Sequence, residues 1–546
     1  HWHGMHVPHL ADGHPMFAID KGETWVYEFE VMNRAGTYFY HPHTHGMTGK
    51  QVYMGLSGMI LVEDDDEKKL GLPSGEYELP IAIQDRSFDA DNQLVYVTHN
   101  MQKMMGFHGD RILINGKPDT EFAVESRAYR LRIANGSNAR IYKLAWDDGT
   151  PITVLGVDGG LLEAPLQKPY VMMGPGERID VWADFSGRAI GAELVMRSKP
   201  FAGALPPMHE KMVAMMGHGG DGKSGGGMMG GMDHGGDKPG ADGKGGMDHG
   251  SGGGGMGMMG GKGMGGMPGM KLPQGTDYPL FKFRITRKAS SDSPKLPEKL
   301  CTIKRYALAD TANPDKPIPI GISEGMMSML LNGRPFKMDD VQPFEKIKVN
   351  TLQSLDIFHA HDMDDKPAGG GMAGMDHGAA NSTASAPAGG MDHGSGGGGM
   401  GMGMMGRMGM MGGGMGGMGG MNHGADAQSK PVAEAKDGMD HGAGGGGMGM
   451  MGGGMGGGMS MSMAHPIHLH GQQFQIVSRS QDMKEEGYDS VKDGFIDVGW
   501  KDVVLVMPGE RVKIIKPFDN YTGLFTYHCH NLEHEDLGMM RDFLIY

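Results

Sequence analysis

His-Cys-His-Asn-Leu-Glu-His-Glu-Asp-Leu-Gly-Met is the sequence of residues 528–539. In a β-strand, residues i and i+2 face the same side. His528 and His530 are therefore expected to point one way, and Cys529 the other. A metal bound to Cys529 would be joined to metals on the two histidines through a few covalent bonds, which is a short path for electrons between two sites.

The same segment nearly completes a ligand set for copper. A thiolate, two imidazoles and a weak axial thioether are the ligands of blue-copper centres. Cys529, His534 and Met539 can supply three of these groups, and His465 can supply the fourth.

Three further segments carry histidines at the same spacing: His1-Trp2-His3-Gly4, His41-Pro42-His43-Thr44-His45-Gly46 and His465-Pro466-Ile467-His468-Leu469-His470-Gly471. A single His-x-His pair is more often a surface feature than a metal site. Four such clusters in one chain, one with a cysteine between its histidines, indicate metal binding. Besides the ligand set of Cys529, the His-x-His pairs supply eight imidazoles, enough for three further coppers. Zinc is disfavoured, because one cysteine among ten histidines suits redox copper better than a closed tetrahedral site.

The composition excludes several classes of protein. Of 546 residues, 98 are glycine and 56 are methionine, and most of this excess lies in segments 206–272 and 363–463. The formal net charge is −15, which disfavours nucleic acid as a partner. The sequence contains no run of about 18 apolar residues, the length that a membrane-spanning helix needs. Two cysteines, Cys301 and Cys529, make no disulfide scaffold.

Short strands separated by turn signals predict an all-β chain of sandwiches or barrels. The expected strands include residues 25–31, 36–40, 58–62, 81–83, 129–133, 179–182 and 279–285. The chain opens at His1 within an expected strand, so we interpret it as a fragment or a processed chain, with any targeting segment outside it.

In this order, the four histidine clusters resemble those of the multicopper oxidases, and most closely those of the bacterial periplasmic cuprous oxidases. Further parts that resemble the family are residues 49–58, 137–140, 158–162, 332–336 and 499–502. The resemblance covers the folded sequence and leaves out the Gly/Met-rich segments.

The resemblance implies three cupredoxin-like Greek-key β-sandwich domains. Residues 1–70 would be an N-terminally truncated first domain and residues 71–205 a second domain without copper. Residues 206–272 would be a disordered Gly/Met-rich segment. Residues 273–546 would form a third domain, interrupted by a second such segment at 363–463. The type 1 copper is expected in the third domain, and the trinuclear cluster between the first and third.

Matching positions assign the four copper ions to residues of this chain. The type 1 copper would be bound by His465, Cys529, His534 and Met539. The type 2 copper would be bound by His1 and His468, and the type 3 pair by His3, His41, His43, His470, His528 and His530. Asp12 and Glu535 lie where the family relays protons, and a carboxyl within reach of the cluster can deliver them. His45 matches a family histidine outside the ligand set.

The Gly/Met-rich segments repeat Met-Asp-His-Gly, which offers a thioether, a carboxylate and an imidazole together. Thioether sulfur selects Cu(I). We expect these segments to capture Cu(I), although a neutral linker is the plainer interpretation. Met461 and Met463 lie directly before His465, where the resemblance puts two substrate ligands. They are therefore candidate ligands of substrate Cu(I), although Met461 stands where the family has an aspartate.

These observations predict a monomeric oxidase that oxidises Cu(I) and reduces dioxygen to water, serving copper detoxification. A laccase that oxidises phenols or other organic donors is the alternative. A copper-binding buffer without turnover is an alternative of another class. A periplasmic or secreted location follows from the resemblance alone.

Overall fold

The structure, a computed structural model, describes residues 1–207, 210, 272–325, 328–360 and 462–546. Strands in five sheets make up most of the regular structure in these ranges, so the prediction of an all-β chain is confirmed. The two Gly/Met-rich segments lie almost entirely outside the described residues, and Met461 lies outside them.

The N-terminal sheet has the strand order β1-β2-β3, with β1 at Trp2–His3, β2 at Gly36–Tyr40 and β3 at Gly58–Val62. The pairing of β1 with β2 sets His3 opposite Phe39. The predicted strand at 25–31 is wrong. Its aromatic side chains pack on Trp2, with ring centroids 5.3 Å away for Tyr27 and 5.6 Å for Phe29, but its backbone joins no sheet.

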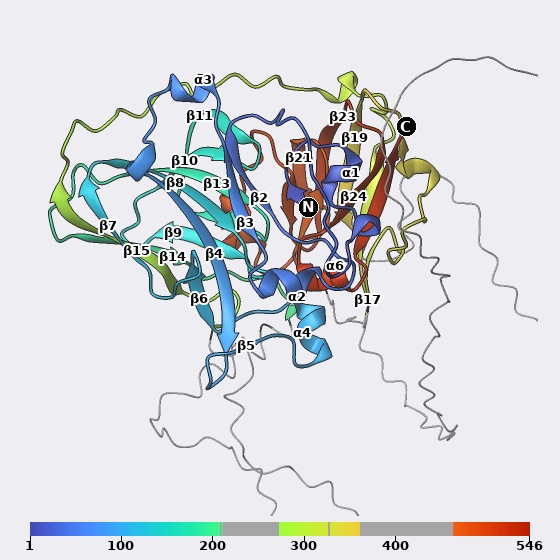
Figure 1. Ribbon diagram of the computed structural model, residues 1–546, viewed down its shortest axis with the longest axis horizontal. Coiled ribbons are helices and arrows are strands. Elements are labelled where there is room, and N and C mark those ends of the chain that lie inside the picture. The colour runs from blue at the N-terminus through green and yellow to red at the C-terminus, as the bar shows by residue number, and fades with distance from the viewer. Residues whose placement is uncertain (208–209, 211–271, 326–327, 361–461) are drawn as a thin grey trace, which may run out of the picture. The chain divides into compact units, whose positions relative to one another are not determined.

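Two facing sheets enclose the next core (Figure 1). One has the order β11-β10-β13-β8-β4-β5, with β6 paired to β4, and the other β12-β9-β14-β15-β7. Their strands are β4 (Glu78–Phe88), β5 (Leu94–Val95), β6 (Arg111–Ile114), β7 (Glu121–Ser126), β8 (Ala128–Asn135), β9 (Tyr142–Trp146), β10 (Ile152–Val157), β11 (Gly160–Lys168), β12 (Val171–Met173), β13 (Arg178–Asp184), β14 (Glu193–Ser198) and β15 (Tyr278–Lys288).

One strand departs from the expected grouping. We expected residues 279–285 in the third domain, but β15 pairs with β14 and β7. Its inward side chains, Phe281 and Phe283 among them, fill the core between these two facing sheets, and this burial explains the placement. The domain limits themselves stay a prediction.

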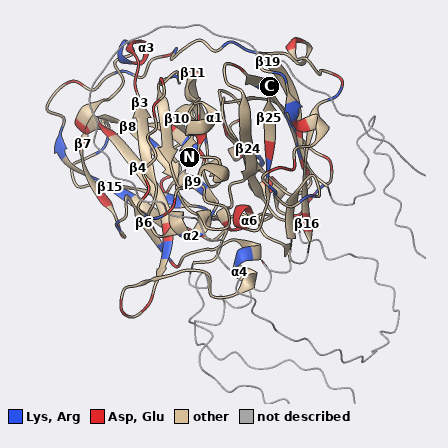
Figure 2. Cartoon of the chain, turned by 45° about the vertical axis from the view of Figure 1, so that its right-hand side comes forward, with Lys and Arg blue, Asp and Glu red and all other residues tan. Residues whose placement is uncertain are grey.

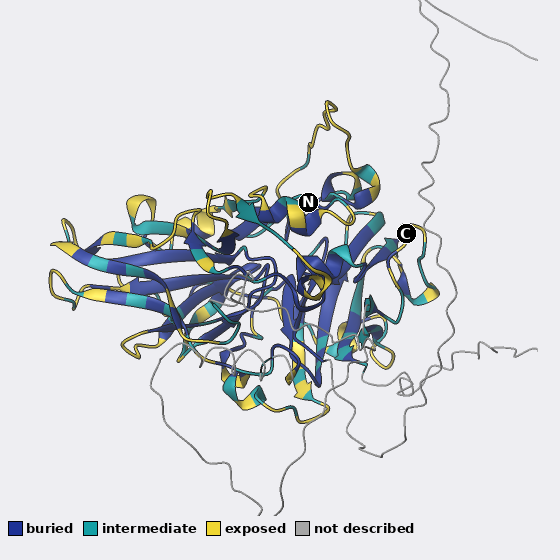
Figure 3. Cartoon of the chain, turned by 90° about the horizontal axis from the view of Figure 1, so that it is seen from below, coloured by how far each residue is buried: buried dark blue, intermediate teal, exposed yellow. Residues whose placement is uncertain are grey.

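The C-terminal part forms the last two sheets, of order β17-β16-β19-β23-β21 and β18-β25-β24-β20-β22. Their strands are β16 (Ile318–Gly325), β17 (Ser328–Leu331), β18 (Lys346–Ile347), β19 (Thr351–His359), β20 (His465–Leu469), β21 (Gln475–Gln481), β22 (Val503–Val506), β23 (Glu510–Phe518), β24 (Gly523–Cys529) and β25 (Met540–Ile545). Figure 3 shows that most residues of these strands are buried, as are most residues in the two facing sheets that contain β4 to β15.

The α-helices within the described residues are short connectors. They are α1 (His9–Asp12), α2 (Thr48–Tyr53), α3 (Asp65–Lys68), α4 (Asn100–Met105) and α6 (Leu532–Asp536). The Asp536 carboxylate joins α6 to α2 by accepting from the backbone N–H groups of Thr48 and Gly49. None of the helices in the described ranges is long and apolar enough to cross a membrane.

Candidate metal centre

Cys529 ends β24 with its thiol inside a fully buried site. Its Sγ lies 3.3 Å from His465 Nδ1, at the start of β20, and 3.7 Å from His534 Nδ1, on α6. The three ligand atoms lie within 4.8 Å of one another. Met539, also buried, accepts the Cys529 backbone N–H at its carbonyl, 3.1 Å away. The structure thus brings together the four residues predicted for the type 1 copper.

The outer nitrogens of the two imidazoles are already occupied. His465 Nε2 lies 2.8 Å from Glu324 Oε1, and His534 Nε2 lies 2.9 Å from the carbonyl of Met104. These contacts leave both Nδ1 atoms facing the thiol, in the way that outer partners orient metal-binding histidines. Burial raises the pKa of the Cys529 thiol, so a cation would have to displace its proton. A thiol with two oriented imidazoles fits copper.

Eight histidines from four segments form a second buried cluster. Their closest ring nitrogens are 3.2 Å apart between His1 and His468, 3.4 Å between His3 and His41, 3.3 Å between His43 and His528, and 3.2 Å between His470 and His528. The ring of His530 lies 4.9 Å from that of His3. All eight residues predicted for the type 2 and type 3 coppers therefore converge.

The protonation of this cluster fits metal ions. Burial, together with the neighbouring imidazoles, lowers the pKa of six of the rings well below the usual value: His3, His41, His43, His468, His470 and His530. Burial also lowers the pKa of His528 to about 4. Among the residues that the structure describes, neither ring nitrogen of buried His530 has a hydrogen-bond partner in another residue. Neutral, converging imidazoles with an unpartnered nitrogen are suited to bind copper.

The two carboxyls predicted to relay protons contact this cluster. Asp12 Oδ2 lies 2.6 Å from His470 Nδ1, and burial raises the pKa of Asp12 to about 7. Glu535 belongs to α6, whose acidic residues stand out in Figure 2, and its Oε2 lies 3.2 Å from His528 Nδ1. Burial raises the pKa of Glu535 well above its usual value. Both carboxyls can therefore hold a proton near neutral pH beside a predicted ligand.

Sequence reasoning missed three residues that touch these sites: Glu324, Asp502 and Arg178. Asp502 had a signal, because it stands in the matched segment 499–502, yet no role was assigned to it. Glu324 and Arg178 had none, because Glu324 lies 141 residues from its partner His465, and Arg178 lies 324 residues from its partner Asp502.

Met463 lies near the Cys529 site, and His45 does not. Met463 is buried, and its backbone N–H donates to Glu324 Oε1 at 2.7 Å, which places it beside the partner of His465. His45 lies outside both clusters, with its ring 5.1 Å from that of Phe336, in keeping with its omission from the ligand set.

Two family models, each described as multicopper oxidase, match residues 1–67 and 457–546. A laccase from Bacillus stratosphericus is 38% identical over 205 residues, and multicopper oxidase mco from Staphylococcus aureus is 37% identical over 188 residues. Each alignment covers 34% of this chain, and 40% and 41% of the relative. The matched part therefore spans about two fifths of the length of these curated relatives.

Among solved structures, the 2F4 variant of the McoA multicopper oxidase from Aquifex aeolicus has a TM-score of 0.62. It is 25% identical, and the match covers 100% of this chain and 84% of that one. The fold is therefore that of multicopper oxidases, with their cupredoxin-like domains. The two family models cover the segments that carry both histidine sites, so in these segments the chain matches the multicopper oxidase family.

Proposed function

We propose that the chain is a copper-dependent oxidase that accepts electrons from Cu(I) near Cys529 and delivers them to dioxygen, forming water, at the eight-histidine cluster. Four bound coppers would supply the electron transfer and the oxygen chemistry. His465, Cys529, His534 and Met539 would hold one of them, and the eight clustered histidines the other three.

One observation carries this proposal: the end of β24 belongs to both sites. Cys529 Sγ lies within 4.8 Å of the ring nitrogens of His465 and His534. Its neighbours His528 and His530 lie in the histidine cluster instead. Two buried sites one residue apart along the backbone provide a covalent path for electrons between them.

The contact between Glu324 and His465 supports a cationic electron donor. This carboxylate lies against the outer nitrogen of a ligand that faces the Cys529 site. A negative charge at the entry point attracts Cu(I) and does nothing for a neutral phenol. The methionine-rich composition of the chain points the same way, because thioethers select Cu(I). Met463 and Met461 remain candidate ligands of that substrate.

Proton supply falls to Asp12 and Glu535. Each carboxyl contacts a histidine of the cluster, and each has a raised pKa that lets it carry a proton at neutral pH. Asp12 serves the side of His470, and Glu535 the side of His528. Copper detoxification in the periplasm, or outside the cell, is the setting we propose for this reaction.

Oxygen uptake by the copper-loaded chain tests the proposal, with Cu(I) and a phenol as separate donors at matched concentrations. We expect faster uptake with Cu(I), and a decrease when residues 211–271 and 363–460 are deleted. Faster uptake with the phenol in copper-free buffer would instead establish a laccase, the activity named for the Bacillus relative. Copper binding without uptake from any donor would establish a copper buffer.

A further inference from the structure

Arg178, the first residue of β13, is fully buried although it belongs to the sheets expected to hold no copper. All five N–H groups of its guanidinium are used. Nε donates to the carbonyl of Thr37, and the two terminal nitrogens donate to the carbonyls of Gly176 and Asp158 and to both carboxylate oxygens of Asp502. This side chain therefore joins β2, its own sheet and the segment before β22.

The fork of Arg178 fixes the plane of the Asp502 carboxylate. Nη2 lies 2.7 Å from Oδ2, and the second terminal nitrogen bonds Oδ1. Two parallel bonds of this kind restrain both position and rotation, which a single bond does not. Beside the pair, Lys501 Nζ lies 3.0 Å from Asp158 Oδ2 and 3.0 Å from Glu177 Oε1.

Asp502 in turn holds two histidines of the cluster. Its Oδ1 lies 3.1 Å from His3 Nε2, and its carbonyl lies 2.8 Å from His468 Nδ1. A carboxylate accepts hydrogen bonds only, so the Nε2 of His3 carries the hydrogen. Nδ1 of His3 is then the nitrogen left for the cluster, where it lies 3.4 Å from His41 Nε2.

The glycine after His3 gives independent support. At Gly4, φ is +79°, and an added Cβ would lie 2.4 Å from Asp502 Oδ2 and 2.7 Å from Arg178 Nη2. The strand that carries His3 therefore lies directly against the ion pair and leaves no space for a side chain.

We propose that Arg178 is a positioning residue for the histidine cluster: through Asp502 it fixes the ring orientation and tautomer of His3, so that Nδ1 faces the bound metal. The sheets expected to be a copper-free spacer thus set the geometry of a site that lies outside them. The inference uses the proposed function only in that the cluster binds copper.

The test compares Arg178→Gln with Arg140→Gln in the full-length, copper-loaded protein. Arg140 is a matched control, because it is also fully buried, lies between β8 and β9 of the same pair of sheets, and bonds Asp85 at 2.7 Å and the carbonyls of Gly109 and Leu272 instead of Asp502. For Arg178→Gln we expect retained blue absorption from the Cys529 site. We also expect a new electron paramagnetic resonance signal, because a misplaced His3 would uncouple the spins of the copper pair that it is predicted to bind. Copper affinity of the cluster should fall about 10–100-fold, as on loss of an outer partner.

Arg178→Lys should restore part of the lost affinity, because it keeps the charge but not the fork. An unchanged spectrum and copper content in Arg178→Gln, or the same new signal in Arg140→Gln, would overturn the proposal. Nitrogen NMR of labelled His3 in the copper-free protein reports the tautomer of this ring directly and does not depend on turnover. The wild type should carry the hydrogen on Nε2 of His3, and Arg178→Gln should show a mixture of both tautomers. The same tautomer in both proteins would overturn the inference, even if Cu(I) oxidation is confirmed. If the tautomers are as expected but the protein takes up no oxygen, only the proposed function is contradicted.

Discussion

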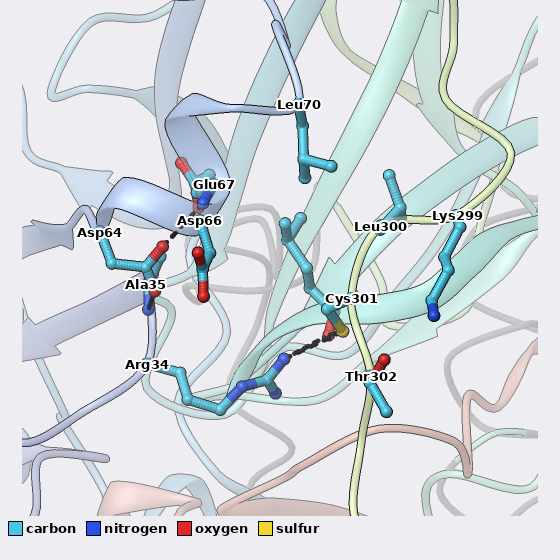
Figure 4. A pocket seen from close by; sticks show the side chains of 11 residues that line it. Arg34, Ala35, Asp64, Asp66, Glu67, Leu70, Lys299, Leu300, Cys301 and Thr302 are labelled. Carbon is cyan, nitrogen blue, oxygen red and sulfur yellow. Dashed lines mark hydrogen bonds between the residues drawn. The ribbon is translucent and has the colours of Figure 1, made fainter.

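Cys529 and Cys301 are the two cysteines of the chain, and they lie in opposite surroundings. Cys529 is fully buried, with imidazole nitrogens 3.3 and 3.7 Å from its sulfur. Cys301 is half-buried and lines a cavity of about 530 Å³ (Figure 4). Its sulfur lies 3.1 Å from Arg34 Nη2, which donates to it, and 3.1 Å from the Leu162 carbonyl, to which the thiol donates.

The difference indicates that the neighbours of a thiol, more than the thiol itself, decide whether it is suited to bind a metal. Burial raises the pKa of both thiols. Around Cys529, neutral imidazoles offer lone pairs to a cation that displaces the thiol proton. Around Cys301, the guanidinium of Arg34 repels a cation, and the described part of the chain places no histidine with it in a potential metal group.

The largest expected effect comes from removing the thiol that has imidazole neighbours. Cys529→Ser should abolish the blue absorption and lower Cu(I) oxidation to the rate of the copper-free protein. Removing one member of a unit that acts together costs about as much as removing all of it. Optical spectra and oxygen uptake measure both effects. Blue colour that survives in Cys529→Ser but disappears in Cys301→Ser would reverse the comparison.

The second effect concerns the carboxyls beside the histidine cluster, compared with a carboxyl beside the Cys301 cavity. Asp12→Asn combined with Glu535→Gln should slow oxygen reduction by about 10²–10⁴-fold, the usual contribution of proton transfer. Copper content should stay unchanged. Asp66→Asn is the control, because Asp66 lines the Cys301 cavity. Single-turnover reoxidation of the reduced protein isolates this step, and an unchanged rate in the double variant would remove both carboxyls from the relay.

Acid should destabilise the copper-free protein through the surroundings of Cys529. Burial lowers the pKa of His465 to about 3, whereas unfolding returns it to about 6.5. Between these values the unfolded chain binds more protons, so stability is complete above about pH 6.5 and falls as the pH drops. His465 alone accounts for roughly 2–3 kcal/mol between about pH 7 and about pH 4.5. Urea unfolding across this range should give a flatter profile for His465→Gln, while Cys301→Ser should follow the wild type.

The site was more predictable from the sequence than its support. His528, Cys529 and His530 could be placed because the strand period fixes the faces of adjacent residues. Glu324 and Arg178 could not, because only tertiary packing brings them to the histidines. The same limit explains the fold errors. The alternation at 25–31 predicts an apolar face but does not predict a strand to pair with. The pattern of β15 likewise does not predict which sheet this strand joins.

A smaller effect is expected at the entry to the Cys529 site. Glu324→Gln keeps a hydrogen-bonding group on His465 but removes the negative charge. We expect Cu(I) oxidation to slow by about tenfold, equivalent to about 1.4 kcal/mol, with phenol oxidation nearly unchanged. Glu163→Gln is the control, because the negative charge of Glu163 acts on the other thiol, where it helps to raise the pKa of Cys301. Equal slowing with both donors would show that Glu324 orients His465 and does not select a cationic substrate.

The smallest effect should follow from Cys301→Ser, which sharpens the contrast between the thiols. A hydroxyl can replace the thiol as donor to the Leu161 and Leu162 carbonyls and as acceptor from Arg34. We therefore expect unfolding free energy to change by no more than about 1 kcal/mol, with unchanged copper content, blue absorption and Cu(I) oxidation. Thiol labelling of the native copper-loaded wild type should modify Cys301, the half-buried thiol, and leave Cys529 unmodified until the chain unfolds. Loss of copper in Cys301→Ser would mean that a thiol bonded to a guanidinium and backbone carbonyls can still support a metal site.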